Sequence, residues 1–343
     1  MKTQLLDTLN GDFEKSIAVA GEILKNGGLV AIPTETVYGL AANALNEEAV
    51  KSIYVAKGRP GDNPLIVHIA DFEDILPLVK EIPPSAKLCM EKFWPGPFTA
   101  VLKKSDLVPK TVSGGLDTVA VRMPNHQTAR RIIKSSGCPL AAPSANLSGS
   151  PSPTTAKHCI DDLFGKVDGI VLADDCRVGV ESTVVSFAVN PPRLLRPGGI
   201  TAEQLRELVP DLVIDEAVLK EPEKNQKVAS PGMKYKHYSP LADVTMAEGN
   251  TESFVKYCNM YGEEYDLVLC FNEDALELKG IKHLTYGGKK EYSVQAESLF
   301  ARLREIDRLG VKKVLADAPE KEGMGLAVYN RLIRAAGFKV IYL

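Results

Sequence analysis

The run Pro139-Leu-Ala-Ala-Pro-Ser-Ala-Asn-Leu-Ser-Gly-Ser-Pro-Ser-Pro153 joins a short apolar strand to a loop of small polar residues. Its serines carry hydroxyls on short side chains, Asn146 carries an amide, and Gly149 allows close backbone approach. Such a loop, stiffened by its prolines, suits a phosphate or a nucleotide. Because the same composition is typical of an ordinary turn, the interpretation depends on the rest of the chain.

Length and composition predict a globular protein of two domains. The chain has 343 residues, of which 45% are hydrophobic and 25% charged, with a net charge of -3. This charge argues against a general polyanion binder but is compatible with a local basic cleft. The six scattered cysteines form no C-x-x-C pair, which favours reduced thiols. We expect a cytoplasmic protein without membrane association, since no signal peptide or membrane-length apolar run is present.

Polar residues follow the first predicted strand, 29–33, directly. Thr34 to Leu40 contains two threonine hydroxyls, a carboxylate and a phenol within a few positions. These groups are costly to bury without partners, so we expect them to line a cleft at the carboxyl end of the strand. A capped turn is the alternative. Helices are predicted before and after this segment, over 12–26 and 46–57, from their apolar spacing and their caps.

Cations and small donors recur at the ends of other predicted strands. Lys57 and Arg59 flank a glycine in a loop that also holds Asn63, which would suit a phosphate clamp or a solvated basic loop. His68, in an apolar strand, is more typical of a core residue. Arg122 interrupts the strand 118–122 and needs an anion if buried, for which a substrate carboxylate is a candidate. This repetition predicts one convergent site.

The C-terminal third alternates predicted strands and helices, which indicates a smaller, Rossmann-like α/β domain over 241–343. It contains no G-x-G-x-x-G, and the whole chain lacks a Walker A sequence and H-E-x-x-H. The N-terminal α/β domain is predicted over 1–209, with a linker over 210–240. Aromatic and basic residues interleave in 230–240, so the linker is expected to fold over a nucleotide, with His237 or Tyr238 at the ligand.

Six motifs, in their order along the chain, strongly resemble the YrdC-like threonylcarbamoyl-AMP synthases. They are Pro-Thr-Glu-Thr-Val-Tyr-Gly-Leu (33–40), Lys-Gly-Arg-Pro with Asn-Pro-Leu-Ile-Val-His (57–68), Trp-Pro-Gly-Pro-Phe-Thr (94–99), Pro-Ser-Ala-Asn-Leu-Ser-Gly (143–149), Glu-Ser-Thr-Val-Val (181–185) and Leu-Arg-Pro-Gly (195–198). Ser-Pro-Gly-Met-Lys-Tyr-Lys-His-Tyr (230–238) and the extra domain are similar to the two-domain branch of that family. The resemblance implies a twisted mixed sheet in the YrdC-like domain.

The resemblance also implies a reaction. L-Threonine, bicarbonate and ATP would give threonylcarbamoyl-adenylate and pyrophosphate, with Mg²⁺ held mainly by the ATP phosphates rather than by protein side chains. The product would pass to a tRNA threonylcarbamoyl transferase complex, which forms N6-threonylcarbamoyladenosine beside the anticodon of tRNAs reading codons that begin with A. A weak direct contact with tRNA is left open.

The same resemblance implies two sets of site residues, one around L-threonine and one around ATP. The residues expected around L-threonine are Thr36, His68, Arg122, Ala142 through its backbone, and Ser182. The residues expected around ATP are Lys57, Arg59, Asn63, Thr118, Ser144, Asn146, Ser152, Arg196 and Tyr238, of which Lys57, Arg59, Ser144 and Arg196 are expected to act in catalysis. Catalysis is expected mainly from positioning and electrostatics.

The alternative is an RNA-binding module without adenylating activity, in which a concave basic surface holds tRNA or double-stranded RNA. The cations here are single residues beside small polar loops rather than a continuous Lys/Arg stripe. This placement favours a small-molecule pocket.

Overall fold

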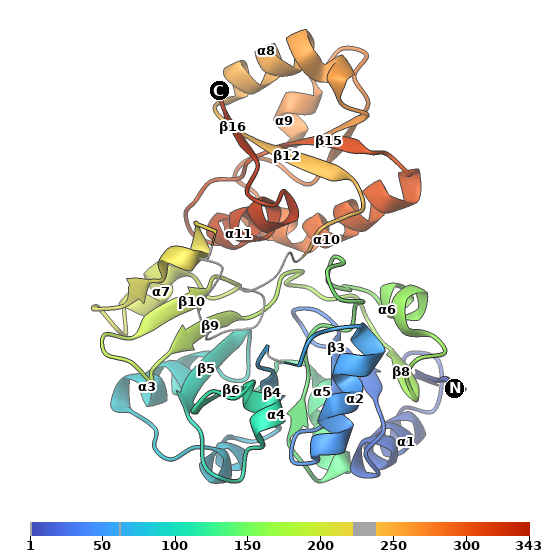
Figure 1. The fold of residues 1–343 in the computed structure, drawn as a ribbon, viewed down its shortest axis with the longest axis vertical. Helices are drawn as coiled ribbons and strands as arrows, with labels where there is room; N and C mark the ends of the chain where they lie inside the picture. The colour runs from blue at the N-terminus through green and yellow to red at the C-terminus, as the bar shows by residue number, and fades with distance from the viewer. Residues whose placement is uncertain (1, 62, 222–237) are drawn as a thin grey trace. The chain divides into compact units, whose positions relative to one another are not determined.

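The computed structural model describes residues 2–61, 63–221 and 238–343, which form two compact units (Figure 1). The first comprises 2–61, 63–148 and 152–218, and the second comprises 149–151, 219–221 and 238–343. Residues 213–218 of the predicted linker form β11 and η2 in the first unit. The part of the predicted linker over 222–237, which includes His237, lies outside the described residues.

The first unit is built on a mixed sheet. Within the described residues it has eleven strands in the order β1-β8-β2-β3-β7-β4-β6-β5-β9-β10-β11. Parallel pairs such as β4 with β6 alternate with antiparallel pairs such as β5 with β6. The strands are β1 (Gln4–Asp7), β2 (Val30–Ile32), β3 (Gly39–Asn43), β4 (Ile66–His68), β5 (Phe98–Lys103), β6 (Thr118–Arg122), β7 (Leu140–Ala141), β8 (Gly169–Leu172), β9 (Thr183–Ser186), β10 (Arg193–Arg196) and β11 (Val213–Ile214).

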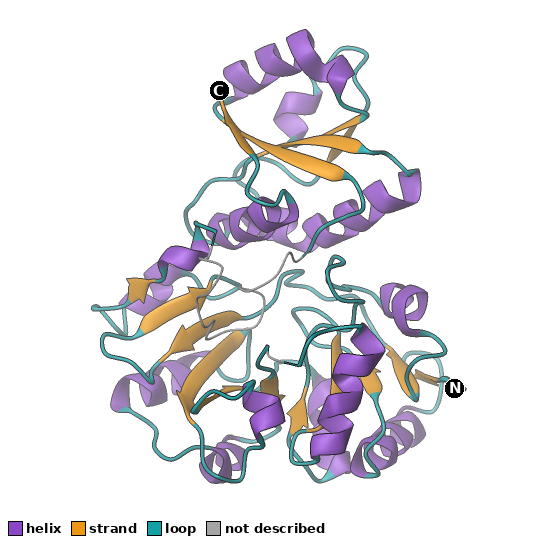
Figure 2. Cartoon of the chain, viewed as in Figure 1, coloured by secondary structure: helices purple, strands orange, loops and turns teal. Residues whose placement is uncertain are grey.

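Helices flank this sheet (Figure 2). They are α1 (Phe13–Lys25), α2 (Glu47–Lys57), η1 (Phe72–Leu78), α3 (Pro84–Phe93), α4 (Lys110–Ser113), α5 (Gln127–Ser136), α6 (Ala156–Leu163), α7 (Ala202–Arg206) and η2 (Glu216–Val218), where η marks a 3-10 helix. Side-chain caps, of which Asn46 was predicted, explain where α1 and α2 begin. Asp12 accepts a hydrogen bond from the Lys15 amide, and Asn46 accepts from the amides of Glu48 and Ala49.

Alternation along the strands sorts the apolar residues into clusters on opposite faces of the sheet. Ala31 and Leu40 belong to the large core cluster, whereas Val30 and Ile32 belong to a second cluster that α1 and α5 complete. A third, smaller cluster contains Ala120. Since Val119 and Val121 on the same strand face the large core, the side chains of Ala120 and its even-numbered neighbours lie on the other face.

The second unit is a parallel five-stranded sheet in the order β14-β13-β15-β12-β16, with helices packed on it. Its elements are β12 (Asp243–Glu248), α8 (Thr251–Tyr261), η3 (Gly262–Glu264), β13 (Leu267–Cys270), α9 (Asn272–Ala275), β14 (His283–Thr285), α10 (Tyr292–Leu309), β15 (Lys313–Asp317), α11 (Gly325–Ala335) and β16 (Val340–Tyr342). The predicted Rossmann-like α/β pattern is confirmed.

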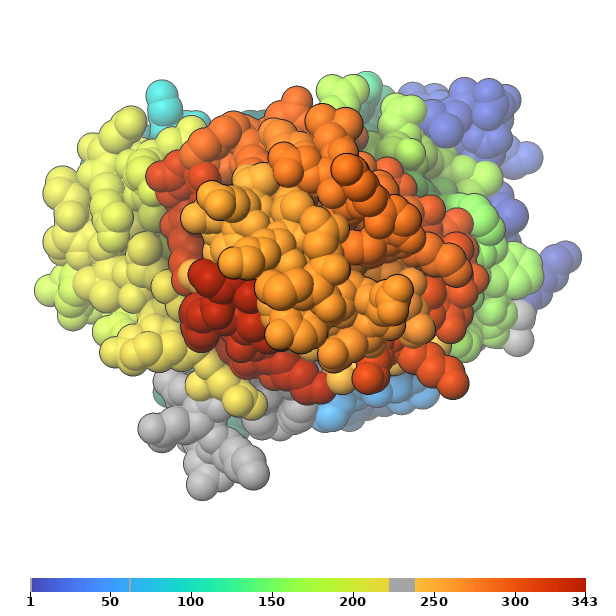
Figure 3. Space-filling view, turned by 90° about the horizontal axis from the view of Figure 1, so that it is seen from above, coloured from blue at the N-terminus to red at the C-terminus, as the bar shows by residue number. Residues whose placement is uncertain are grey.

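In Figure 3 the light-orange residues around α8 form part of the molecular surface.

The cysteines and the helices bear on two expectations from the sequence. All six cysteines are described, and each is a free thiol. Among the described helices, none is both long enough and apolar enough to cross a membrane.

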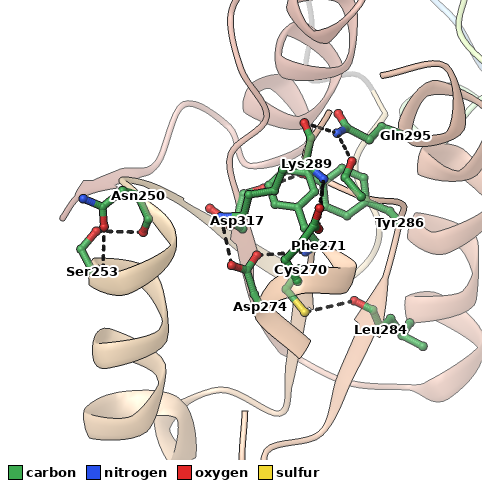
Figure 4. Close-up of polar contacts among 12 residues, drawn as sticks. Asn250, Ser253, Cys270, Phe271, Asp274, Leu284, Tyr286, Lys289, Gln295 and Asp317 are labelled. Atoms are coloured by element: carbon green, nitrogen blue, oxygen red, sulfur yellow. Dashed lines mark hydrogen bonds and ion pairs between the residues drawn. The ribbon is translucent and has the colours of Figure 1, made fainter. Parts of the chain in front are cut away.

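A charged cluster is buried in the second unit, at the carboxyl ends of β13 and β15 (Figure 4). The Lys289 ammonium lies 3.0 Å from Asp274 Oδ1 and 3.4 Å from Asp317 Oδ2, and both carboxylates are almost fully buried. Burial, followed by the neighbouring Asp274, raises the pKa of Asp317 well above its usual range. Burial thus favours the protonated form of Asp317, and Lys289 is the cation in contact with this buried acidic pair.

Replacing Lys289 with methionine is expected to destabilise the second unit by about 3 kcal/mol, because it leaves the buried Asp274 and Asp317 pair without the cation that contacts both side chains. Amide hydrogen exchange in β13 and β15 measures this directly. The matched control is Lys290→Met, since Lys290 is the next residue and pairs with Glu320 in solvent. Equal exchange rates in the two variants would contradict a stabilising role for the cluster.

Candidate functional site

Several polar residues of interest lie at the ends of neighbouring strands of the first unit and on one face of its sheet. His68 on β4 lies opposite Arg122 on β6, and Arg122 in turn lies opposite Thr99 on β5. Thr118 lies on β6 with Arg122, two alternations away, and so projects to the same side. His68 is the last residue of β4 and Arg122 the last of β6, and the two strands are parallel, so both side chains lie at carboxyl ends of strands. The sheet's pleat directs these side chains away from the large core.

Arg122 is the centre of the best-defined cluster. Its side chain is 4% exposed. Nη1 donates to Thr36 Oγ1 at 2.8 Å, Nε donates to the Gly96 carbonyl at 3.3 Å, and Nη2 lies 2.7 Å from Glu35 Oε2. A guanidinium has five N–H groups, so two remain for a ligand after one is used for each of these three partners. A ligand carboxylate could therefore bind Arg122 without displacing Glu35.

Thr36 is positioned by the turn that follows β2. Thr34 Oγ1 lies 2.8 Å from Thr36 Oγ1 and donates to the Val37 carbonyl at 2.6 Å, which closes the turn. The backbone carbonyl of Glu35 accepts from the Val178 amide at 2.8 Å. The turn directs one hydroxyl and one carboxylate at Arg122.

His68 is buried beside Arg122. Burial and, secondarily, the Arg122 charge lower the pKa of His68 to about 3, so the ring is neutral at physiological pH. Nδ1 lies 3.2 Å from the Ile66 carbonyl. A carbonyl only accepts, so Nδ1 carries the ring proton in this contact and Nε2 is left as an acceptor. His68 can thus accept a hydrogen bond from a ligand hydroxyl or amine.

Ser182 and Arg196 form a second cluster that adjoins the first through β5. Ser182 Oγ lies 2.8 Å from Thr99 Oγ1, and Thr99 is the register neighbour of Arg122. Arg196 donates to the Ser182 carbonyl through Nε at 3.1 Å and to Ser182 Oγ through Nη2 at 3.2 Å. Thr36, His68, Arg122, Ser182 and Arg196 are therefore brought together by contacts and strand pairing.

The loop after β7 forms the third cluster. Lys57, at the end of α2, donates through Nζ to the carbonyls of Ser144 and Asn146, each at 2.5 Å. Ser144 Oγ donates to Asn146 Oδ1 at 2.6 Å. The Ser152 hydroxyl donates to Glu181, the residue before Ser182. Ser152 is thereby linked to the second cluster, while Lys57, Ser144 and Asn146 are linked to one another.

The other predicted residues lie on several different elements. Asn63 is buried, and neither polar atom of its side chain has a hydrogen-bond partner in the structure. Arg59 lies in the loop after α2, and the Ala142 amide donates to the Ile66 carbonyl. Tyr238 belongs to the second unit, where its ring packs on Phe300.

Two buried polar residues in these clusters, Thr99 and Glu181, received no role from the sequence. Glu35 was expected to line a cleft, but no partner was predicted for it. The available signal was local: Glu35 stands between two threonines, and Glu181 directly precedes Ser182. Nothing in that signal identifies Arg122 as the partner of Glu35, because the two residues are distant in the chain.

Sequence models of known families match both parts of the chain. The Sua5/YciO/YrdC family model, described as "telomere recombination", matches residues 22–198. A model described as "threonylcarbamoyl-AMP synthase, C-terminal domain" matches residues 200–337.

Individual proteins match the chain over nearly its full length. It is 45% identical to a threonylcarbamoyl-AMP synthase of Pyrococcus abyssi, with 96% of each chain covered. It is also 45% identical to a threonylcarbamoyl-AMP synthase of Bacillus subtilis, with 96% of this chain and 95% of the relative covered. The crystal structure of P. abyssi Sua5 complexed with L-threonine has 43% sequence identity and a TM-score of 0.92, and the match covers 99% of this chain and 100% of that one.

Proposed function

Because this chain belongs to the Sua5/YciO/YrdC family, we infer that it is a threonylcarbamoyl-AMP synthase. It condenses L-threonine, bicarbonate and ATP to threonylcarbamoyl-adenylate and pyrophosphate. The full-length similarity to enzymes of that name supports this activity. The crystal structure of the P. abyssi relative with L-threonine supports threonine as the amino acid.

The observation that carries the proposal for the site is the buried Arg122 with Thr36, Glu35 and His68 around it. A cation that is 4% exposed cannot contact the backbone of a nucleic acid, but it can hold one small anion. We therefore favour a small-molecule site over an RNA-binding surface. In this proposal the two remaining N–H groups of Arg122 bind the threonine carboxylate, with Thr36, His68, Ser182 and the Ala142 backbone around the rest of the amino acid.

The ATP side of the proposed site uses the loop clusters. The carbamate oxygen attacks the α-phosphorus of ATP, and pyrophosphate leaves. Arg196 and the hydroxyls of Ser144 and Ser152 would offset the charge that develops on the phosphoryl oxygens. The unpartnered amide of buried Asn63 supports this assignment, since such a group gains hydrogen bonds when a ligand arrives. Arg59, Lys57, Asn146, Thr118 and Tyr238 complete the proposed ATP-binding set.

We propose that Mg²⁺ enters with ATP and neutralises part of the phosphate charge. The described residues contain no group of three or more His, Cys, Asp and Glu side chains placed to hold a metal. The donors near Ser144 and Ser152 are hydroxyls and amides, which suit the phosphate oxygens of such a complex. The protein's part would be to bind and orient those phosphates.

Threonylcarbamoyl-adenylate is an activated mixed anhydride, so an acceptor must consume it. We propose that a tRNA threonylcarbamoyl transferase complex takes it to form N6-threonylcarbamoyladenosine in tRNAs that read codons beginning with A. The site of action would be the cytoplasm, where ATP, threonine and tRNA occur together.

The deciding experiment measures pyrophosphate release from ATP and Mg²⁺, with L-threonine and bicarbonate each added and omitted. The proposed function requires both substrates for release. If a folded protein releases no pyrophosphate under any condition, the synthase assignment is wrong, and RNA titrations at increasing salt would then test the binding module.

Arg59→Ala is expected to lower the rate of pyrophosphate release at saturating substrates by about 100-fold, because one preorganised donor to the phosphates is lost. The same assay measures it, with Arg131→Ala as a control that exchanges an arginine paired with Glu14 at the surface. A wild-type rate in Arg59→Ala would show that Arg59 does not act on the transferred phosphate.

A further inference from the structure

Glu35 is a buried carboxylate with too few partners. Its side chain is 10% exposed, and neither oxygen makes a well-aligned hydrogen bond in the structure. Its one described cation is Arg122, with Nη2 2.7 Å from Oε2. A buried carboxylate has about four lone-pair sites and normally fills several of them. Glu35 therefore lies beside the proposed substrate position with capacity for a further donor.

The substrate's chemistry supplies that donor. An amino acid carries its ammonium group one carbon away from its carboxylate, so a carboxylate bound to Arg122 brings the ammonium close to the neighbours of Arg122. His68 is neutral and Thr36 already contacts Arg122, which leaves Glu35 as the anion in this cluster. An ammonium also gains most from an anion that water does not screen.

We propose that Glu35 binds the threonine ammonium and takes one of its protons when the carbamate forms. This inference rests on the proposed function. An ammonium has no free electron pair, so it cannot attack carbon until it loses a proton. One N–H bond breaks and the proton goes to a Glu35 carboxylate oxygen; the freed amine pair then forms the N–C bond to bicarbonate. A second amine proton leaves with the bicarbonate hydroxyl as water, which gives the carbamate.

The test separates carbamate formation from adenylation in Glu35→Gln. The forward assay measures threonylcarbamoyl-adenylate made from threonine, bicarbonate and ATP. The reverse assay measures ATP made from threonylcarbamoyl-adenylate and pyrophosphate, a step that involves no ammonium. We expect the forward rate to fall by about 100-fold, as for the loss of a general base, and the reverse rate to fall by less than about 5-fold. Glu35→Asp, which keeps the carboxylate, should recover part of the forward rate.

Equal losses in both directions would overturn the proposal, because they would make Glu35 only a support for Arg122. Glu181→Gln is the matched buried control: Glu181 accepts from Ser152 on the proposed ATP side, so its loss should affect both directions alike. Glu14→Gln, at the surface, should change neither. If the wild-type protein is inactive in both assays, the proposed function itself fails, which distinguishes that result from a failure of the Glu35 assignment.

Discussion

Replacing Arg122 with alanine is expected to lower kcat/KM for L-threonine by about 1,000-fold, a loss of about 4 kcal/mol in transition-state stabilisation. The change removes the proposed partner of the substrate carboxylate. It also leaves Glu35 buried without its cation and Thr36 without its donor. Pyrophosphate release at saturating ATP, as a function of threonine concentration, measures the effect.

Arg122→Lys tests whether the positive charge alone accounts for the effect of Arg122. Lysine keeps the charge, but its ammonium cannot contact Thr36, Gly96 and Glu35 at the same time as the planar guanidinium does. We therefore expect a substantial loss in this variant as well, while KM for ATP changes little in either. An unchanged threonine dependence in folded Arg122→Ala would exclude Arg122 from amino acid binding.

Local sequence signals predicted most of the secondary structure. The helices predicted over 12–26 and 46–57 are α1 and α2, and the predicted cap Asn46 begins α2. The strand β3 was missed. Its sequence, Gly-Leu-Ala-Ala-Asn, contains no β-branched residue, and its conformation depends on pairing with β2 and β7.

The position of the candidate site on the sheet was harder to predict. Thr118 and Arg122 face the same side as Ala120, while Val119 and Val121 face the large core. Ala120 stands between Thr118 and Arg122, so an apolar residue interrupts the polar positions on the face that carries the site. The sequence alone could therefore indicate that Arg122 needs an anion, but it could not identify Glu35 as one.

Lys57→Met is expected to destabilise the first unit by about 2–6 kcal/mol and to abolish most activity. Lys57 is 3% exposed, and its ammonium donates to two carbonyls of the loop that carries Ser144 and Asn146. Methionine has a similar length but no donor, so both carbonyls would lose their charged partner at about 1–3 kcal/mol each. Urea unfolding followed by the fluorescence of Trp94 reports on this unit alone, since Trp94 is the single tryptophan.

The comparison of stability with activity decides what Lys57 does. Lys51→Met, on the same helix, is the control, because Lys51 pairs with Glu48 in solvent and should leave both quantities unchanged. If Lys57→Met unfolds at lower urea and loses activity, the ammonium organises the loop that presents Ser144 and Asn146. If it loses activity at unchanged stability, the loop forms without it, and the charge of Lys57 acts on the ATP phosphates instead.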